Sequence, residues 1–118
     1  MNSTFYFVLT ESDTSLAVGR PVYFNASGQL KYCTSTDTPA VGVIISISET
    51  DGSTVACVGI LKQVLKCRVK DDFTATPGED MELSDLYGVT KGTNLGVLGY
   101  ALSGKDSDGL VNVLTQFC

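Results

Sequence analysis

The sequence contains no histidine and no tryptophan. Without histidine the chain cannot form the Ser-His or Cys-His pairs that activate many nucleophiles, nor a zinc site of mixed Cys and His ligands. Basic residues are also few, because eight Lys and Arg stand against thirteen Asp and Glu, for a formal net charge of -5. Such a chain is poorly suited to neutralising phosphates, so no nucleic-acid partner is expected.

Long hydrophobic runs are missing as well. The longest apolar run near the start, Phe5 to Leu9, is too short to span a bilayer, and no basic residue precedes it as in a signal peptide. We therefore expect synthesis in the cytoplasm and no membrane partner.

The four cysteines form no C-x-x-C pair. Cys57 and Cys67 are therefore predicted to be small buried hydrophobic side chains. The segment from Asp106 to Gly109 begins like a calcium loop, but the later ligands of such a loop are missing, and a turn explains it better. No catalytic residue, metal or cofactor is expected.

What the sequence does contain is a series of short β-type segments separated by turn signals. With 118 residues and 43% hydrophobic residues, one domain is expected. Residues 41–48 are almost continuously apolar, which predicts a central strand covered on both faces. The other predicted strands are residues 4–10, 21–25, 30–33, 81–84, 96–102 and 110–117, with a hairpin turn at 25–28. The pattern predicts an all-β fold, either a small barrel or a sandwich.

The two halves of the sequence resemble each other. The first contains, in order, GRPVYF, Gly28, GVIIS and GSTV, and the second answers with GEDMEL, Gly88, GYALS and GLVNV. We divide the chain into an N-terminal arm and first strand (1–18) and a single β domain (19–118). The halves of that domain are expected at about 19–70 and 71–118.

Residues 55–69 can be read in two ways. Odd positions from Val55 to Val69 form an apolar face if the segment is a strand, although apolar residues also recur at helical spacing between 60 and 69. The strand is preferred because valine, cysteine and Gly59 favour it. The opposite face would then carry a basic stripe made of Lys62, Lys66, Arg68 and Lys70. This stripe is either a partner-binding surface or, the preferred alternative, a solvated face or a partner for nearby carboxylates.

The aromatic residues Phe5, Tyr6 and Phe7 present a similar choice between a core strand and a docking arm. A core strand is preferred, because an exposed aromatic run promotes aggregation.

Taken together, GRPVYFNASGQLKYCTSTDTPAVGVIIS, GSTVACVGILKQVLKC, TPGEDMEL and LGYALSGKDSDGLVNVL resemble the small head decoration (capsid cement) proteins of tailed bacteriophages. The resemblance covers nearly the whole chain from Gly19 and lies in the order and spacing of glycine-led strands and hairpins. It implies a small β-barrel or β-tulip-like domain built from two similar hairpin-containing halves. It also implies a homotrimer on the outer surface of the virion that binds the major capsid protein of the expanded shell and stabilises it. Some members add an N-terminal strand to the capsid protein, which by analogy assigns that contact to Asn2, Ser3, Thr4, Phe5, Tyr6 and Phe7.

Two other functions remain open. The first is an accessory binding module displayed on the virion, or the base of a head fibre, that contacts host surface glycans. It requires exposed aromatic side chains for stacking on sugars. The second is a carrier domain of the biotinyl type, which requires a lysine at a tight hairpin tip.

Overall fold

The computed structural model describes residues 3–33, 40–69, 76–78, 80–84, 88–91 and 97–115, and describes only the backbone of 80–84, 88–91, 97 and 98. All regular elements within these ranges are β-strands, so the all-β prediction is confirmed. The strands are β1 (Thr4–Val8), β2 (Pro21–Phe24), β3 (Leu30–Tyr32), β4 (Gly42–Thr50), β5 (Ser53–Ile60), β6 (Val64–Arg68), β7 (Asp80–Ser84), β8 (Gly88–Lys91), β9 (Val97–Ala101) and β10 (Leu110–Thr115). The described residues include no helix long and apolar enough to cross a membrane.

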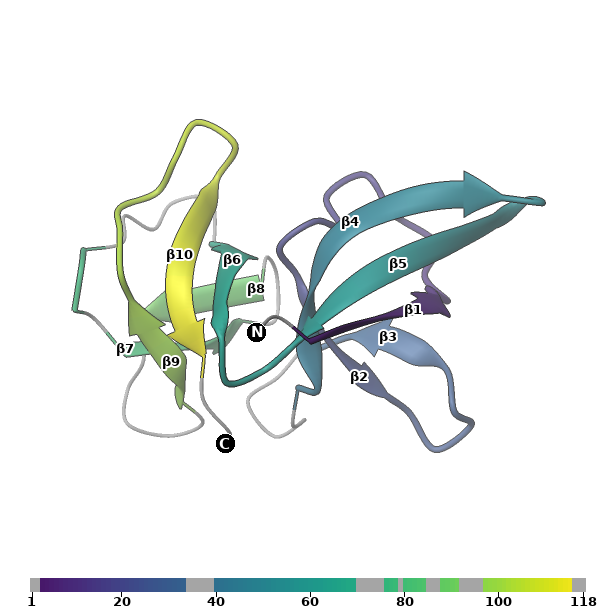
Figure 1. Cartoon of the computed structure of the whole chain (residues 1–118), viewed down its shortest axis with the longest axis horizontal. Coiled ribbons are helices and arrows are strands. Elements are labelled where there is room, and N and C mark those ends of the chain that lie inside the picture. Colours follow the sequence, from purple (N-terminus) through teal and green to yellow (C-terminus); the bar gives the residue numbers. More distant parts are fainter. Residues whose placement is uncertain are drawn as a thin grey trace.

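The strands form two antiparallel sheets with the same topology (Figure 1). The first sheet has the order β1-β5-β4-β2-β3, and the second has the order β6-β10-β9-β7-β8. Each strand of the first sheet therefore has a counterpart five strands later in the chain. We call β1 to β5 the first unit and β6 to β10 the second unit.

The chain passes from one unit to the other at residues 61–63. Lys62 has a positive φ of 75° there, and this sharp bend separates β5 from β6. The first strand, β1, belongs to the first sheet, where it pairs with β5. In the topology its counterpart is β6, which pairs with β10 in the same way.

The predicted hairpin at residues 21–33 is confirmed. Strands β2 and β3 pair antiparallel, with Phe24 opposite Leu30. The Asn25 side-chain oxygen accepts hydrogen bonds from the amides of Ser27 (2.9 Å) and Gln29 (3.0 Å), which fixes the turn. Gly28 supplies the positive φ of 76° that closes it.

The prediction that β4 is covered on both faces is only partly correct. Val43 and Ile44 point to opposite faces, and both are almost completely buried. From Ile45 onward, however, the strand pairs only with β5, because β2 reaches no further than Val43. Ile45 is 45% exposed, and the outer part of β4 and β5 projects from the molecule as a two-stranded ribbon (Figure 1).

Residues 55–69 are two strands rather than one, so the single apolar face predicted for this segment is wrong as a whole. Within β6 the alternation holds, since Leu65 and Cys67 are buried and Lys66 is exposed. The buried stretch of β5 includes the even positions Ala56 and Val58. No helix forms between residues 53 and 69, so the strand interpretation is confirmed for the two parts on either side of the bend.

Two hydrophobic clusters support this arrangement. One lies within the first unit and includes Leu9, Val22, Leu30, Ile44 and Val58. The other joins the two units, because Cys33 and Val43 of the first unit pack with residues of β6, β9 and β10. The predicted burial of Cys57 and Cys67 is confirmed.

Candidate binding surfaces

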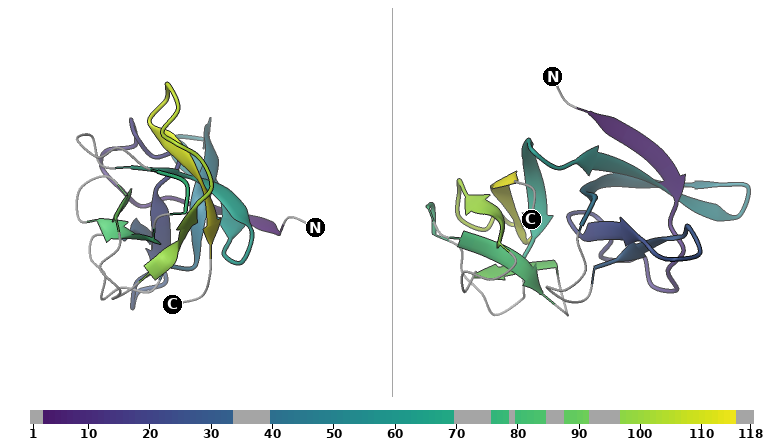
Figure 2. Two further views of the ribbon diagram at one scale, coloured as in Figure 1. Left: turned by 90° about the vertical axis from the view of Figure 1, so that its left-hand side faces the viewer. Right: turned by 90° about the horizontal axis from the view of Figure 1, so that it is seen from below.

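The N-terminal candidate residues lie at the edge of the first sheet. Asn2 is outside the described residues. The carbonyl of Ser3 accepts a hydrogen bond from the amide of Ile60 at 3.0 Å. Residues 4–7 belong to β1, which pairs with β5 along its whole length and lies on the outside of the first unit (Figure 2).

Three phenylalanine side chains form an aromatic cluster at this edge. The ring centroid of Phe24 lies 5.9 Å from that of Phe5 in a stacked arrangement and 5.0 Å from that of Phe7 in an edge-on arrangement. Such pairs contribute about 0.5–1.5 kcal/mol each beyond the burial of their area. Phe5 is half-buried, whereas Phe7 and Phe24 are exposed. The preferred core interpretation therefore holds for Phe5 and is wrong for Phe7.

Tyr6 points away from the aromatic cluster, because successive side chains of a strand alternate between its faces. It is 71% exposed, so the core interpretation is wrong for this residue as well. A hydrogen bond with the thiol of Cys57, the residue opposite it on β5, raises the pKa of Tyr6. β1 thus presents aromatic surface on both of its faces.

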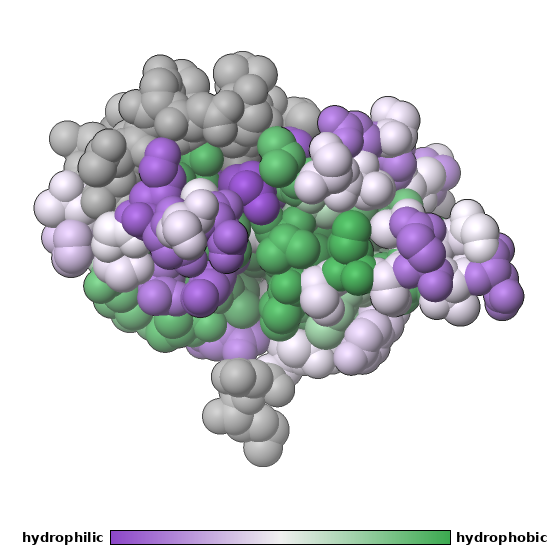
Figure 3. Space-filling model, turned by 90° about the horizontal axis from the view of Figure 1, so that it is seen from above, coloured by the Kyte–Doolittle hydropathy of each residue, from purple (hydrophilic) through white to green (hydrophobic). Residues whose placement is uncertain are grey.

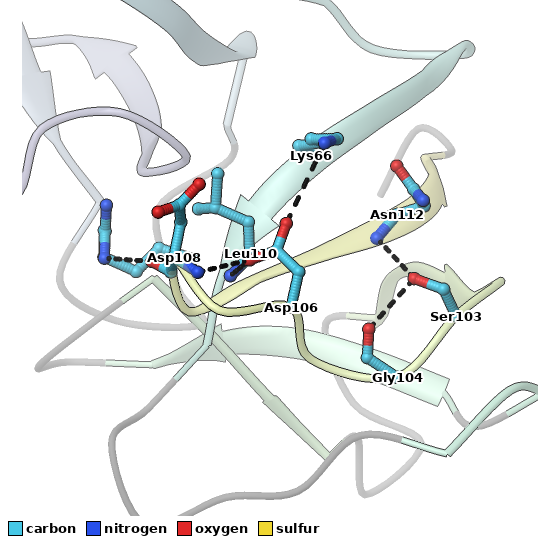
Figure 4. Close-up of polar contacts among 8 residues, drawn as sticks. Lys66, Ser103, Gly104, Asp106, Asp108, Leu110 and Asn112 are labelled. Carbon is cyan, nitrogen blue, oxygen red and sulfur yellow. Dashed lines mark hydrogen bonds and ion pairs between the residues drawn. The ribbon is translucent and has the colours of Figure 1, made fainter.

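The four basic candidates do not form one stripe. Lys62 lies in the bend between the units, Lys66 and Arg68 lie in β6, and Lys70 is outside the described residues. The Nζ atom of Lys66 is 3.8 Å from Oδ2 of Asp106, in an exposed pair (Figure 4). Exposed ion pairs of this kind contribute little to stability. Of the three candidates that the structure describes, Lys66 and Arg68 lie two residues apart in β6, and Lys62 lies outside the strand.

Arg68 joins the two units. Its amide donates to the carbonyl of Gly19 at 2.8 Å, and its Nε donates to the carbonyl of Val18 at 3.0 Å. Its Nη1 atom donates to the carbonyl of Asp108 at 3.2 Å. The two side-chain bonds give the guanidinium group a structural role inside the molecule.

The predicted turn at Asp106 is confirmed. Oδ1 of Asp106 accepts hydrogen bonds from the amides of Asp108 (2.8 Å) and Leu110 (3.0 Å), as Figure 4 shows. These bonds, the one from Leu110 first, hold the pKa of Asp106 below its ordinary value. The carboxylate that suggested a calcium loop is therefore used to close the hairpin between β9 and β10.

The thiol of Cys67 is fully buried. Burial raises the pKa of Cys67 to about 12, so the thiol stays protonated at neutral pH, and its Sγ donates to the carbonyl of Leu65 at 3.9 Å. Among the residues whose side chains are described, no three Cys, Asp or Glu side chains lie close enough to hold a metal ion. The clustered acidic residues of the sequence, at 71, 72, 79, 80 and 82, have no described side chains.

An apolar groove of about 250 Å³ lies between the units. Its lining includes Val18 and Ile45 of the first unit and Val64 and Leu110 of the second. Hydrophobic atoms gather between the two units on the face shown in Figure 3. Val64 and Lys66 of β6 also line this groove.

A row of exposed apolar side chains crosses the second sheet. Leu114 lies directly opposite Val64 on one side and Tyr100 on the other. All three are exposed, Tyr100 by 39% and Leu114 by 41%. Residue type alone did not predict this row. The available signal was the alignment of GVIIS with GYALS, which places Tyr100 at the position of Val43.

No family model, curated protein or solved structure matches the chain.

Proposed function

We propose that this chain is a head decoration protein of a tailed bacteriophage, which binds the outer surface of the expanded capsid and stabilises it without covalent bonds. The proposal includes the major capsid protein as partner, a homotrimer on the shell, and units shaped as small β-barrels or β-tulips. It starts from the sequence resemblance and is supported by the exposed aromatic side chains of β1.

The observation that carries the proposal is the exposed aromatic surface on both faces of β1. A free chain in the cytosol gains nothing from exposing Tyr6, Phe7 and Phe24, because exposed apolar patches promote aggregation. Aromatic side chains are frequent hot spots of protein interfaces. We assign the aromatic cluster and Tyr6 to the contact with the capsid protein. Lys62 and Arg68 are not assigned to it, because Lys62 lies in the bend between the units and the Arg68 side chain bonds within the molecule.

A lattice of identical subunits suits a small adhesive protein. Each copy needs only modest affinity if neighbouring copies on the shell also contact one another, since linked sites raise the overall affinity. The surface can then remain small enough for the free protein to stay soluble.

One observation also favours the displayed accessory module. Exposed aromatic rings such as Tyr6 and Tyr100 are suited to stacking on sugars. Such a module would bind glycans in the absence of a shell, and its attachment would add no stability to the capsid.

The test is cosedimentation of the purified protein with expanded and unexpanded shells from the phage that encodes it. We expect saturable binding to expanded shells only. Phe7→Ser should weaken that binding by roughly tenfold or more, which corresponds to about 1.4 kcal/mol. The matched control is Leu16→Ser, which also removes an exposed apolar side chain but lies outside the aromatic cluster. Absence of binding to either shell would overturn the proposal.

A further inference from the structure

We propose that copies of this chain associate head to tail by repeating, between molecules, the contact that joins the two units within one molecule. The inference extends the self-association included in the proposed function and names the surfaces involved. It is tested without shells, so the two proposals can fail separately.

The contact within the molecule has two parts, and the first is a turn seated in a corner. The turn Val18–Gly19 of the first unit lies against Arg68 and Leu110 of the second. A Cβ on Gly19 would lie 2.6 Å from Leu110 Cδ2 and 2.7 Å from the Arg68 amide nitrogen. The fit is therefore so close that only glycine can occupy this position.

The second part is a face of the first sheet covered by β6. Val43 and Gly59, which lie opposite each other on β4 and β5, are both buried there. A Cβ on Gly59 would lie 2.5 Å from Leu65 Cδ2, so β6 packs directly on this pair. Val43 is only 1% exposed and belongs to the cluster that joins the units.

This contact is heterologous, because each unit contributes a different surface. The first unit uses its turn and its sheet face, and the second uses its first strand and its corner. The two units have the same topology. The first unit therefore has a strand and a corner equivalent to those that the second unit uses, and the second unit has a turn and a sheet face equivalent to those that the first unit uses. Within the described part of the chain, neither the Val8 end of β1 nor the turn at Gly78 takes part in the contact inside the molecule.

On the first unit the counterpart is the edge of β1 with an open corner beside it. Strand pairing makes Val8 the counterpart of Arg68. The residues that follow them are also equivalent, because the Leu9 amide donates a hydrogen bond to the carbonyl of Thr54 (2.9 Å) and the Val69 amide donates one to the carbonyl of Gly109 (3.2 Å). In the second unit this corner holds the turn Val18–Gly19. In the first unit it is a hollow of about 410 Å³, whose lining includes Val8, Leu9 and Thr54.

On the second unit the counterpart is the turn at Gly78 with the exposed face beside it. The φ of Gly78 is 92° against 91° for Gly19. The Gly78 amide donates to the carbonyl of Ala101 at 2.7 Å, as the Gly19 amide donates to Ile44 at 2.8 Å. Tyr100 and Leu114 lie opposite each other, as Val43 and Gly59 do, but are exposed. Because Leu114 carries a side chain where Gly59 has none, a strand on this face would pack farther from the sheet than β6 does from Gly59.

The match gives a specific contact. The turn of Pro77 and Gly78 in one copy enters the hollow beside Val8 of the next, and β1 of that copy lies beside Tyr100 and Leu114. The Leu9 amide faces β5, so the Val8 amide faces the outer edge and can donate to the Gly78 carbonyl of the neighbour. Open strand edges and exposed apolar faces are both suited to such pairing. A heterologous contact of this kind forms a closed ring or a filament.

The first experiment is sedimentation equilibrium of the protein alone, up to millimolar concentrations. We expect reversible association, weakened by roughly tenfold or more in Leu114→Glu. The matched control, Ser107→Glu, adds the same charge at an exposed turn of the same hairpin. A protein that is monomeric at all concentrations, or an association that Leu114→Glu leaves unchanged, would overturn the inference.

The second experiment does not depend on the folding of Leu114→Glu. In a Cys118→Ser background, a Val8→Cys chain is mixed with a Pro77→Cys chain and oxidised. A covalent dimer of the two chains should form well above the level given by Val8→Cys with Ser107→Cys. Equal yields from the two mixtures would contradict the proposed contact. Self-association that is found in a chain unable to bind shells would leave this inference standing and remove the capsid function.

Discussion

Gly19 and Gly28 share a left-handed backbone, but their surroundings differ. The space beside Gly19 is filled by Arg68 and Leu110, whereas a Cβ on Gly28 would meet nothing within 4 Å. We expect Gly28→Ala to cost about 1 kcal/mol, from the backbone conformation alone. Gly19→Ala should cost about 3 kcal/mol or more, because the clash is added to that strain. Urea unfolding of both variants measures the difference, and equal losses would contradict the close seating of the turn.

Cys67 makes stability depend on pH in the alkaline range. Its pKa is raised from 9.0 to about 12 by burial, so above pH 9 the unfolded chain loses this proton and the folded chain keeps it. The free energy of unfolding should therefore fall as pH rises, by about 1.4 kcal/mol per pH unit from this group.

The measurement compares the wild type with Cys67→Ala between pH 8 and pH 10. Burial also raises the pKa of Tyr32 to about 12, but Tyr32 is present in both chains, so the difference between their slopes reports on Cys67. The variant is less stable throughout, but its stability should fall less steeply with pH. Parallel curves would show that the folded thiol ionises as readily as the unfolded one.

At the scale of elements, the connection between the units depends on one buried hydroxyl group. Oγ1 of Thr115 on β10 accepts hydrogen bonds from the amides of Lys62 (3.1 Å) and Gln63 (3.3 Å), and donates to the carbonyl of Gln63 at 2.7 Å. Thr115→Val keeps the shape but removes these bonds, and should cost about 2 kcal/mol. Thr115→Ser keeps the hydroxyl and is the matched control. A loss in the serine variant as large as in the valine variant would indicate that packing, rather than the bonds, holds the bend.

Much of the strand pattern could be predicted from the sequence, because short β segments and turn residues act locally. The hairpin around Asn25 and the turn at Asp106 depend on side chains that bond their own backbone, and both predictions were correct. The bend at Lys62 was not predicted, because a lysine with positive φ carries no sequence signal and the bend is held by Thr115, far along the chain. The exposure of Ile45 was not predicted either. It depends on β2 pairing with β4 only as far as Val43, and the hydrophobicity of Ile45 does not show where that pairing ends.

The candidate site was less predictable than the fold. The sequence indicated that residues 5–7 are important, but not that Phe24 joins Phe5 and Phe7, because that contact joins segments distant in the sequence. The structural equivalence of β1 and β6 could not be predicted either, because TFYFV and VLKCR have no identical residue at any aligned position. Only their pairing with β5 and β10, respectively, shows that they are equivalent.

At the scale of the whole molecule, the two units should unfold together. The cluster that joins them contains Val43 of the first unit together with Leu65 and Val113 of the second, so the core of the second unit is completed by the first. We expect Val43→Ala to lower the stability of the whole molecule by about 2 kcal/mol in one transition. Calorimetry checks this through the agreement of the calorimetric and van't Hoff enthalpies, and two separate transitions would contradict it.

The same duplicated architecture underlies the proposed role in the virion. A chain that binds a shell through β1 and contacts its neighbours through the counterpart surfaces would connect capsid subunits without any chemical reaction. The proposed role requires the bound protein to stabilise the shell as well as to bind it.

The most direct test is to heat expanded shells with and without a saturating amount of the protein and to record the temperature at which the shells rupture. We predict a higher rupture temperature with the bound protein, and a smaller increase with Phe7→Ser at the same concentration. A rupture temperature that is unchanged while the protein remains bound would contradict the cement function and favour the displayed binding module.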